Sequence, residues 1–221
     1  MARRARLVIP GIPLHIIQRG NNRHSCFLAD RDYIVYMSML QRCADQACCL
    51  VHAYVLMTNH VHLLITPEGT KSPGKLMKAL GQRYVQYINR RYRRTGTLWE
   101  GRFRSCIVDD ERYFLTCQRY IELNPVRAEM VEHPRQHLWS SYRANAEGSE
   151  SHLVTPHDVY LRLGQENAER QAAYRDLFQD ELPSEHLEFI RRATNGNYAV
   201  GDAAFKKRAA DVLAQYVEPQ L

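Results

Sequence analysis

The sequence has no long hydrophobic run and no regular cysteine pattern, and each absence excludes a class of protein. No apolar stretch among the 221 residues approaches the roughly 18 residues that a membrane-spanning helix needs. The six cysteines form neither a CxxC pair nor a zinc-finger spacing, which favours reduced, packed thiols. The apolar start is interrupted by Pro10, Pro13 and His15, and no small-residue cleavage site follows. We therefore expect a cytoplasmic protein without a membrane partner.

Two nucleotide-recognition signatures are also incomplete or missing. Residues 69–75 (GTKSPGK) begin like a phosphate-binding loop, but Leu76 stands where that motif needs a magnesium-binding Ser or Thr. We interpret the segment as a loop with a helix cap and expect no nucleotide cofactor. The aromatic-rich RNP1 signature of RNA-binding sheets is absent as well.

Positive charge exceeds negative charge, and the excess is unevenly distributed along the chain. The net charge is +6, with 22 Lys and Arg against 11 Asp and Glu in residues 1–145, and 8 against 13 in residues 146–221. A basic body with an acidic tail region suggests a polyanionic partner for the body. The alternative is a solvated surface that happens to be basic.

The basic residues cluster in two segments. One is interleaved with Tyr84, Tyr87, Tyr92 and Trp99, and arginines can neutralise phosphates while aromatic rings stack on unpaired bases. The alternative is a solvated helix face whose tyrosines, Tyr84 above all, serve the core. The candidate DNA-binding residues are Arg83, Arg90, Arg91, Arg93, Arg94, Arg102 and Arg104, with a second basic arm of Arg3, Arg4 and Arg6.

Hydrophobic periodicity and turn residues predict an α+β fold. The expected order is strand 12–19, helix 30–46, strands 50–57 and 60–66 joined by a tight turn at Thr58 and Asn59, a helix opened by Ser72 and Pro73, strand 103–108, and a helix from 109–111 to Asn124. This is a ferredoxin-like β-α-β-β-α-β antiparallel sheet with an added helix, and it leaves one sheet face free for chemistry. The expected buried stripes are Ile34, Met37, Leu40 and Ala44 in the first helix, and Leu76, Leu80, Tyr84 and Ile88 in the second.

Composition changes near residue 146, where residues 147–151 (EGSES) are typical of a linker. We expect one domain over 1–145 and a helical C-terminal extension over 146–221, with helices near 166–181, 184–194 and 202–217. The extension is equally compatible with DNA binding and with a packing role.

Two pairs of residues are candidates for chemistry. His60 and His62 alternate with Val61 on a predicted strand, so both imidazoles face one side and can chelate a divalent ion. Tyr120 and Asn124 are four residues apart on a predicted helix and share one face. Asn offers an oxygen suited to Mg²⁺ or Mn²⁺, and Tyr offers a nucleophilic hydroxyl. The alternatives are half-exposed histidines, a core tyrosine and a capping Asn.

Three segments resemble one family. Residues 59–65 (NHVHLLI) resemble the HUH motif of single-tyrosine transposases. Residues 119–128 (RYIELNPVRA) resemble the nucleophile helix of the REP-associated tyrosine transposases, and residues 98–104 (LWEGRFR) match the same branch. The resemblance extends over about residues 5–145. It implies that His60, His62 and Asn124 hold the metal and that Tyr120 is the nucleophile. Some HUH relatives use Gln where this chain has Asn124.

The resemblance also implies an activity. Tyr120 would cleave single-stranded DNA near palindromic repeat hairpins, form a 5′-phosphotyrosine link and rejoin the strand without ATP, acting as a monomer or a homodimer. Two other functions remain open from the residues alone. One is a non-catalytic nucleic-acid-binding module, and the other is a metal phosphoesterase that uses water as its nucleophile.

Overall fold

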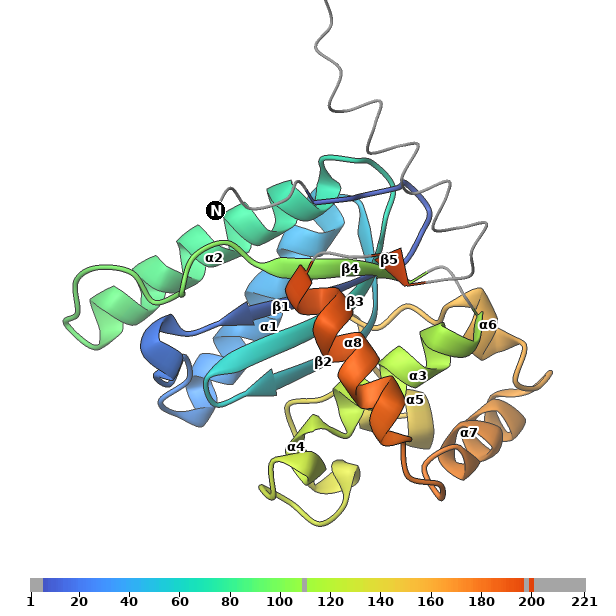
Figure 1. Ribbon diagram of the computed structural model, residues 1–221. Helices are drawn as coiled ribbons and strands as arrows, with labels where there is room; N and C mark the ends of the chain where they lie inside the picture. The colour runs from blue at the N-terminus through green and yellow to red at the C-terminus, as the bar shows by residue number, and fades with distance from the viewer. Residues whose placement is uncertain (1–5, 109–110, 197–198, 201–221) are drawn as a thin grey trace, which may run out of the picture.

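The computed structural model describes residues 6–108, 111–196 and 199–200. The fold is α+β, with one sheet that carries helices on both faces (Figure 1). The sheet order is β2-β3-β1-β4-β5. Its strands are β1 (Leu14–Arg19), β2 (Cys49–Met57), β3 (His60–Pro67), β4 (Arg104–Val108) and β5 (Ala199–Val200). The first four pair antiparallel and β5 pairs parallel to β4. The order of the four antiparallel strands confirms the ferredoxin-like prediction.

The strand register determines which side chains share a face. The β2–β3 hairpin turns at Thr58 and Asn59, as predicted, and pairs Met57 with His60. In the centre of the sheet, β1 pairs Ile17 with His62 and His15 with Leu64, while β4 pairs Cys106 with His15. Because side chains alternate along each strand, the two histidines of β3 and the histidine of β1 are placed on the same side.

The first face of the sheet is covered by α1 (Asp30–Gln46) and α2 (Ser72–Arg91), which lie behind the sheet in Figure 1. The predicted α2 stripe of Leu76, Leu80, Tyr84 and Ile88 is confirmed, since all four side chains are fully buried. Ser72 is the first residue of α2 and not its cap, because the N-cap position belongs to Lys71.

The predicted buried stripe of α1 is wrong in part. Ile34 is 57% exposed, whereas Tyr33 and Tyr36 are buried. The reason is aromatic packing, because the Tyr33 ring stacks on Phe27 at 4.2 Å between centroids and also on Trp139 at 4.8 Å. These contacts turn the tyrosine side of α1 towards the core and leave Ile34 in solvent. Asp30 does not cap α1, since Ala29 is the N-cap and Asp32 accepts from the Leu28 and Ala29 amides.

The second face of the sheet is covered by α3 (Glu111–Glu122) and α8 (Ser184–Gly196), which lie in front of the sheet in Figure 1. The added helix thus packs on the face left free by the ferredoxin-like core. It ends two residues before Asn124, and α4 (Asn124–Arg127) follows with Pro125 in its first turn. The expected start at 109–110 lies outside the described residues.

Shorter helices complete the molecule: η1 (Asn21–Arg23) follows β1, and η2 (Pro134–Gln136), α5 (Tyr142–Glu147), α6 (Asp158–Leu161) and α7 (Asn167–Asp176) follow α4. Of the helices after α4, α7 and α8 match the segments expected near 166–181 and 184–194. Tyr142, Ala146, Tyr160 and Tyr174 form a core cluster of their own. The helix expected at 202–217 lies outside the described residues.

Two predictions from composition concern the cysteines and membrane-spanning helices. All six cysteines are free, and five of them are buried while Cys48 is exposed, which confirms the expectation of mostly packed thiols. Over the described part of the chain, no helix combines the length and the apolar character that crossing a membrane requires.

Candidate functional site

A cavity of about 450 Å³ opens on the second face of the sheet, between β1, β3 and the helices α3, α4 and α8. His60 and His62 come from β3, Tyr120 comes from α3 and Asn124 from the start of α4, and all four line this cavity. The His60 and His62 ring centroids are 5.1 Å apart, and the Tyr120 ring lies 5.8 Å from the His62 ring. The structure therefore brings together all four residues that the sequence singled out.

Hydrogen bonds orient His60 so that one ring nitrogen is left over. Asn59 donates through Nδ2 to the Arg23 carbonyl at 3.0 Å, so its Oδ1 is the atom that faces Nδ1 of His60 at 2.6 Å. An amide oxygen only accepts, and therefore His60 Nδ1 carries the proton. The lone pair of His60 is then on Nε2.

Asn124 is oriented by its own helix. Its Nδ2 donates to the Tyr120 carbonyl at 2.9 Å and to the Ile121 carbonyl at 3.3 Å. This use of the nitrogen leaves Oδ1 as the atom of the Asn124 side chain that is available to a ligand.

His15 is a member of the site that sequence reasoning missed. It is 1% exposed, its Nε2 lies 2.8 Å from Nδ1 of His62, and its Nδ1 lies 2.9 Å from Oγ1 of Thr194 on α8. Its ring stacks on that of His62 with centroids 5.1 Å apart. The sequence offered one signal: His15 shares a face of its predicted strand with Ile17 and Arg19. That pattern does not indicate a partner on α8.

Burial keeps the imidazoles neutral. Desolvation lowers the pKa of His60 to about 4, helped by the Arg19 charge, and it lowers the pKa of His15 to about 3. The pKa of His62 is well below its ordinary value because of desolvation first, and then because of the neighbouring His15, His60 and arginines. Neutral imidazole is the form that binds a metal.

The cavity is positively charged. Its lining includes Arg19, Arg23, Arg104 and Arg191 against a single acid, Glu100. Arg127 stands beside the cavity, with its guanidinium 4.3 Å from the centroid of the Tyr120 ring and its Nη2 donating to the Tyr120 carbonyl at 2.6 Å. Such a lining attracts an anion, and the guanidinium group of arginine matches the geometry of phosphate and carboxylate oxygens.

The donor set fits a divalent metal. The described residues contain no group of three or more His, Cys, Asp or Glu side chains that could hold an ion. The three donors available here are Nε2 of His60, Nε2 of His62 and Oδ1 of Asn124. Two imidazoles with one amide oxygen suit a borderline or hard divalent cation, with positions left over for substrate and water.

The structure divides the candidate DNA-binding arginines. Arg104 lines the cavity and donates to Asn195 Oδ1 at 2.6 Å, and Arg102 lines the pocket beside it. Arg90 lies at the end of α2, and Arg93 and Arg94 lie in the segment after it, which leads to β4 (Figure 1). The basic segment thus runs from the end of α2 to the cavity.

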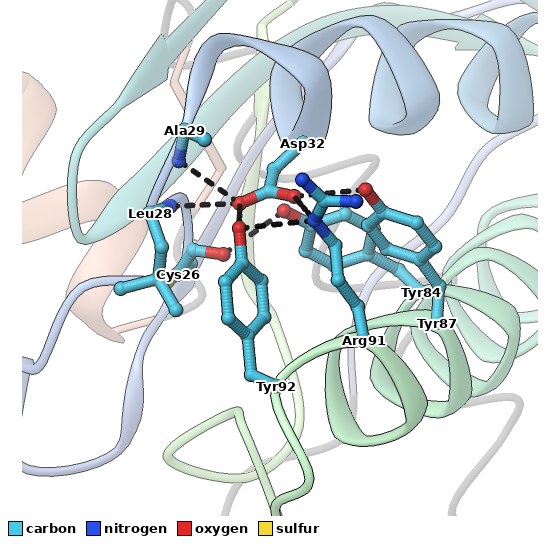
Figure 2. Close-up of polar contacts among 8 residues, drawn as sticks. All are labelled: Cys26, Leu28, Ala29, Asp32, Tyr84, Tyr87, Arg91 and Tyr92. Carbon is cyan, nitrogen blue, oxygen red and sulfur yellow. Dashed lines mark hydrogen bonds and ion pairs between the residues drawn. The ribbon is translucent and has the colours of Figure 1, made fainter.

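Three of these arginines contact protein instead. Arg91 lies 3.6 Å from Oδ1 of the buried Asp32, which also accepts from Tyr87 and Tyr92 (Figure 2). Arg83 contacts Cys43 and Gln46 on α1. Arg6 donates to the Phe103 carbonyl and stacks over the Phe103 ring at 3.8 Å. Arg3 and Arg4 lie outside the described residues.

Comparison with known proteins adds three findings. The family model described as "Transposase IS200 like" matches residues 9–124. A solved structure of a REP-associated tyrosine transposase bound to a REP hairpin is 19% identical, with a TM-score of 0.59 over 72% of this chain and 93% of the other. A protein from Deinococcus radiodurans described as a transposase is 23% identical over 55% of this chain and 96% of the other, with a TM-score of 0.39. A search of curated proteins finds no significant match.

Proposed function

The chain belongs to the IS200-like transposase family, and from that premise we propose that it is a metal-dependent transposase that cleaves and rejoins single-stranded DNA through Tyr120. The observation that carries the proposal is the meeting of His60, His62, Tyr120 and Asn124, from a strand and two helices, at one basic cavity. We assign His60, His62 and Asn124 as ligands of Mg²⁺ or Mn²⁺, making this an HUH site.

The phenol of Tyr120 is the nucleophile in this proposal. Its oxygen attacks the phosphorus, and the new O–P bond gives a 5′-phosphotyrosine. The bond between phosphorus and the 3′ oxygen breaks. The phenol loses its proton, and the departing 3′ oxygen gains one to become a free 3′-OH. Bound at the three ligands, a divalent ion supplies Lewis-acid polarisation of a non-bridging phosphate oxygen. Arg127 holds the Tyr120 segment in place by donating from Nη2 to the Tyr120 carbonyl. Rejoining exchanges one phosphate ester for another, so it needs no ATP.

We propose single-stranded DNA next to a hairpin as the substrate. The solved relative with the same fold is bound to a REP hairpin, and the cavity of this chain has four arginines against one glutamate in its lining. The cavity accepts the scissile phosphate, while the flanking backbone is held by Arg90, Arg93, Arg94, Arg102 and Arg104. The protein acts as a monomer or a homodimer.

The test is incubation of the protein with end-labelled hairpin oligonucleotides that carry single-stranded flanks, with and without Mn²⁺, followed by a denaturing gel. Wild type forms a metal-dependent protein–DNA adduct, and Tyr120→Phe forms none while it still binds the oligonucleotide. Tyr113→Phe is the matched control, because Tyr113 lies on the same helix but packs against Phe189.

Two other results would replace the proposal. Binding with no adduct for any variant indicates a non-catalytic nucleic-acid binder. Cleavage without an adduct, unchanged by Tyr120→Phe, indicates a phosphoesterase that uses water.

A further inference from the structure

We propose that Thr194, on the C-terminal helix α8, is a positioning residue for the buried His15–His62 pair. It sets the proton order of the pair, that is, which ring nitrogen of each histidine carries the proton. As a result, the unprotonated Nε2 of His62 is the nitrogen offered to the cavity. The inference rests on the proposed function, in which His62 is a metal ligand. It gives α8, which lies far from the catalytic segments in sequence, a defined part in the site.

The argument starts at the hydroxyl of Thr194, which is buried. Its Oγ1 donates to the Ile190 carbonyl at 2.8 Å, within the same helix. A hydroxyl has one proton and two lone pairs. With the proton used on Ile190, Oγ1 of Thr194 acts towards its other neighbours as an acceptor.

The proton order of His15 follows from that of Thr194. Nδ1 of His15 lies 2.9 Å from Thr194 Oγ1, and it must be the donor because Oγ1 accepts. In a neutral imidazole only one ring nitrogen carries a proton. Nε2 of His15 is therefore the unprotonated nitrogen and acts as an acceptor.

The order of His62 follows from that of His15. Nδ1 of His62 lies 2.8 Å from Nε2 of His15 and must donate to it. The second ring nitrogen of His62, Nε2, then carries the lone pair. His62 lines the cavity, so this lone pair is the one offered to a ligand there.

The reverse order would disable the ligand. If Thr194 donated to His15, His15 would donate to His62, and the proton of His62 would move to Nε2. A protonated Nε2 cannot bind a metal. The reverse order also takes the hydroxyl proton away from the buried Ile190 carbonyl. Cys106 Sγ, 3.2 Å from Thr194 Oγ1, adds a further thiol neighbour that can donate to the same oxygen.

The arrangement is built from buried groups only, which gives it a fixed geometry. His15 and His62 are 1% and 2% exposed, and Thr194 is 4% exposed. Partners in the second layer around a metal typically change its affinity by about 10- to 100-fold when they are removed. Thr194 acts one step further out, so we expect the lower end of that range.

The test uses Thr194→Val, which keeps the shape and removes the hydroxyl, with Thr194→Ser as the matched variant that keeps it. The first readout is the ¹⁵N shift pattern of the histidine side chains in the metal-free protein, which reports the tautomer of each ring. The second is the Kd for Mn²⁺ alone, measured by the EPR signal of free Mn²⁺. Circular dichroism confirms that each variant is folded.

We expect His15 and His62 of wild type to be protonated at Nδ1. In Thr194→Val the tautomers shift towards Nε2 and the Kd for Mn²⁺ rises by about 10-fold, and Thr194→Ser restores both. A wild-type His62 protonated at Nε2, or a folded Thr194→Val with unchanged tautomers and Mn²⁺ affinity, overturns the inference. Wild type that binds no Mn²⁺ overturns the metal assignment instead, so the two failures are distinguishable.

Discussion

Arg90 and Arg91 are adjacent on α2 but have different surroundings. Both side chains are exposed, but Arg91 is also paired with the buried Asp32 at 3.6 Å and contacts the Tyr92 ring (Figure 2). Asp32 also accepts from two backbone amides and two tyrosine hydroxyls, so it fixes the end of α2 against the start of α1. Although the Arg91 side chain is 41% exposed, we expect it to stay with its buried partner Asp32 and not to bind a phosphate.

We therefore expect Arg90→Ala and Arg91→Ala to differ in DNA binding. Arg90→Ala lowers the slope of log affinity against log salt concentration by about 0.7 to 0.9, the value for one lost phosphate contact. Arg91→Ala leaves that slope unchanged. The measurement is fluorescence anisotropy with a labelled hairpin oligonucleotide over a range of salt. Equal losses of slope in the two variants would show that Arg91 leaves Asp32 when DNA binds.

Single residues also show what the sequence could and could not predict. Strand alternation and helical spacing made His60, His62, Tyr120 and Asn124 candidates, and the family resemblance gave them their expected roles. His15 was missed because its partner Thr194 is 179 residues away. No periodicity within one element indicates that contact.

Glu122, the last residue of α3, links the helix that carries Tyr120 to the C-terminal helices. It is fully buried, and its carboxylate accepts from Ser141 and Asn145 at one oxygen and from Tyr174 at the other, at 2.6, 2.8 and 2.8 Å. Burial raises the pKa of Glu122 to about 7 from 4.5, against the opposite effect of these three donors. The carboxylate thus joins α3 to α5 and α7.

This raised pKa predicts a pH dependence of stability. The folded state holds the Glu122 proton more tightly than the unfolded state does, so its contribution is complete below pH 4.5 and is lost as the pH rises to about 7. Glu122→Gln has no proton to lose. The free energy of unfolding of wild type, relative to Glu122→Gln, should therefore fall by about 3 kcal/mol across this window.

Urea unfolding of both proteins at several pH values between 4.5 and 7.5 measures the effect. The comparison must be made between the two proteins, because His52 and His60 have lowered pKa values and change wild-type stability in the opposite sense. They contribute equally to both proteins and cancel in the difference. A difference that stays constant with pH would contradict the raised pKa.

At the scale of elements, the hairpin and the α2 stripe were predicted because each is a local pattern. The face of α1 was predicted only in part: Leu40 and Ala44 are buried, but Ile34 is exposed, because the tyrosines follow helical spacing as well as Ile34 does. Tyr33 and Tyr36 are buried because Phe27 and Trp139 supply aromatic partners for their rings. Phe27 lies before the helix in a segment with no periodicity, so the sequence pattern does not indicate this contact. Competition between two stripes on one helix is decided by tertiary contacts.

Over the whole molecule, the order of strands and helices was sufficient to predict the ferredoxin-like sheet. The position of the C-terminal region was not predictable in the same way. This region reaches the core at places far apart in the sequence. Ile190 and Ala193 of α8 pack in the same cluster as Tyr120, and between α5 and α6 the Thr155 amide donates to the Val51 carbonyl at 2.7 Å. The division near residue 145 remains a prediction.

These contacts predict the behaviour of a chain ended at residue 145. Such a fragment keeps His60, His62, Tyr120 and Asn124 but loses Tyr174 from Glu122 and Thr194 from His15. Removing a donor from a buried carboxylate costs about 3 kcal/mol, so urea should unfold the fragment at lower concentration than the full chain. A chain ended at residue 200 is the control, because it retains α8. If all three proteins unfold at the same urea concentration, residues 146–200 add no stability and the first 145 residues fold independently.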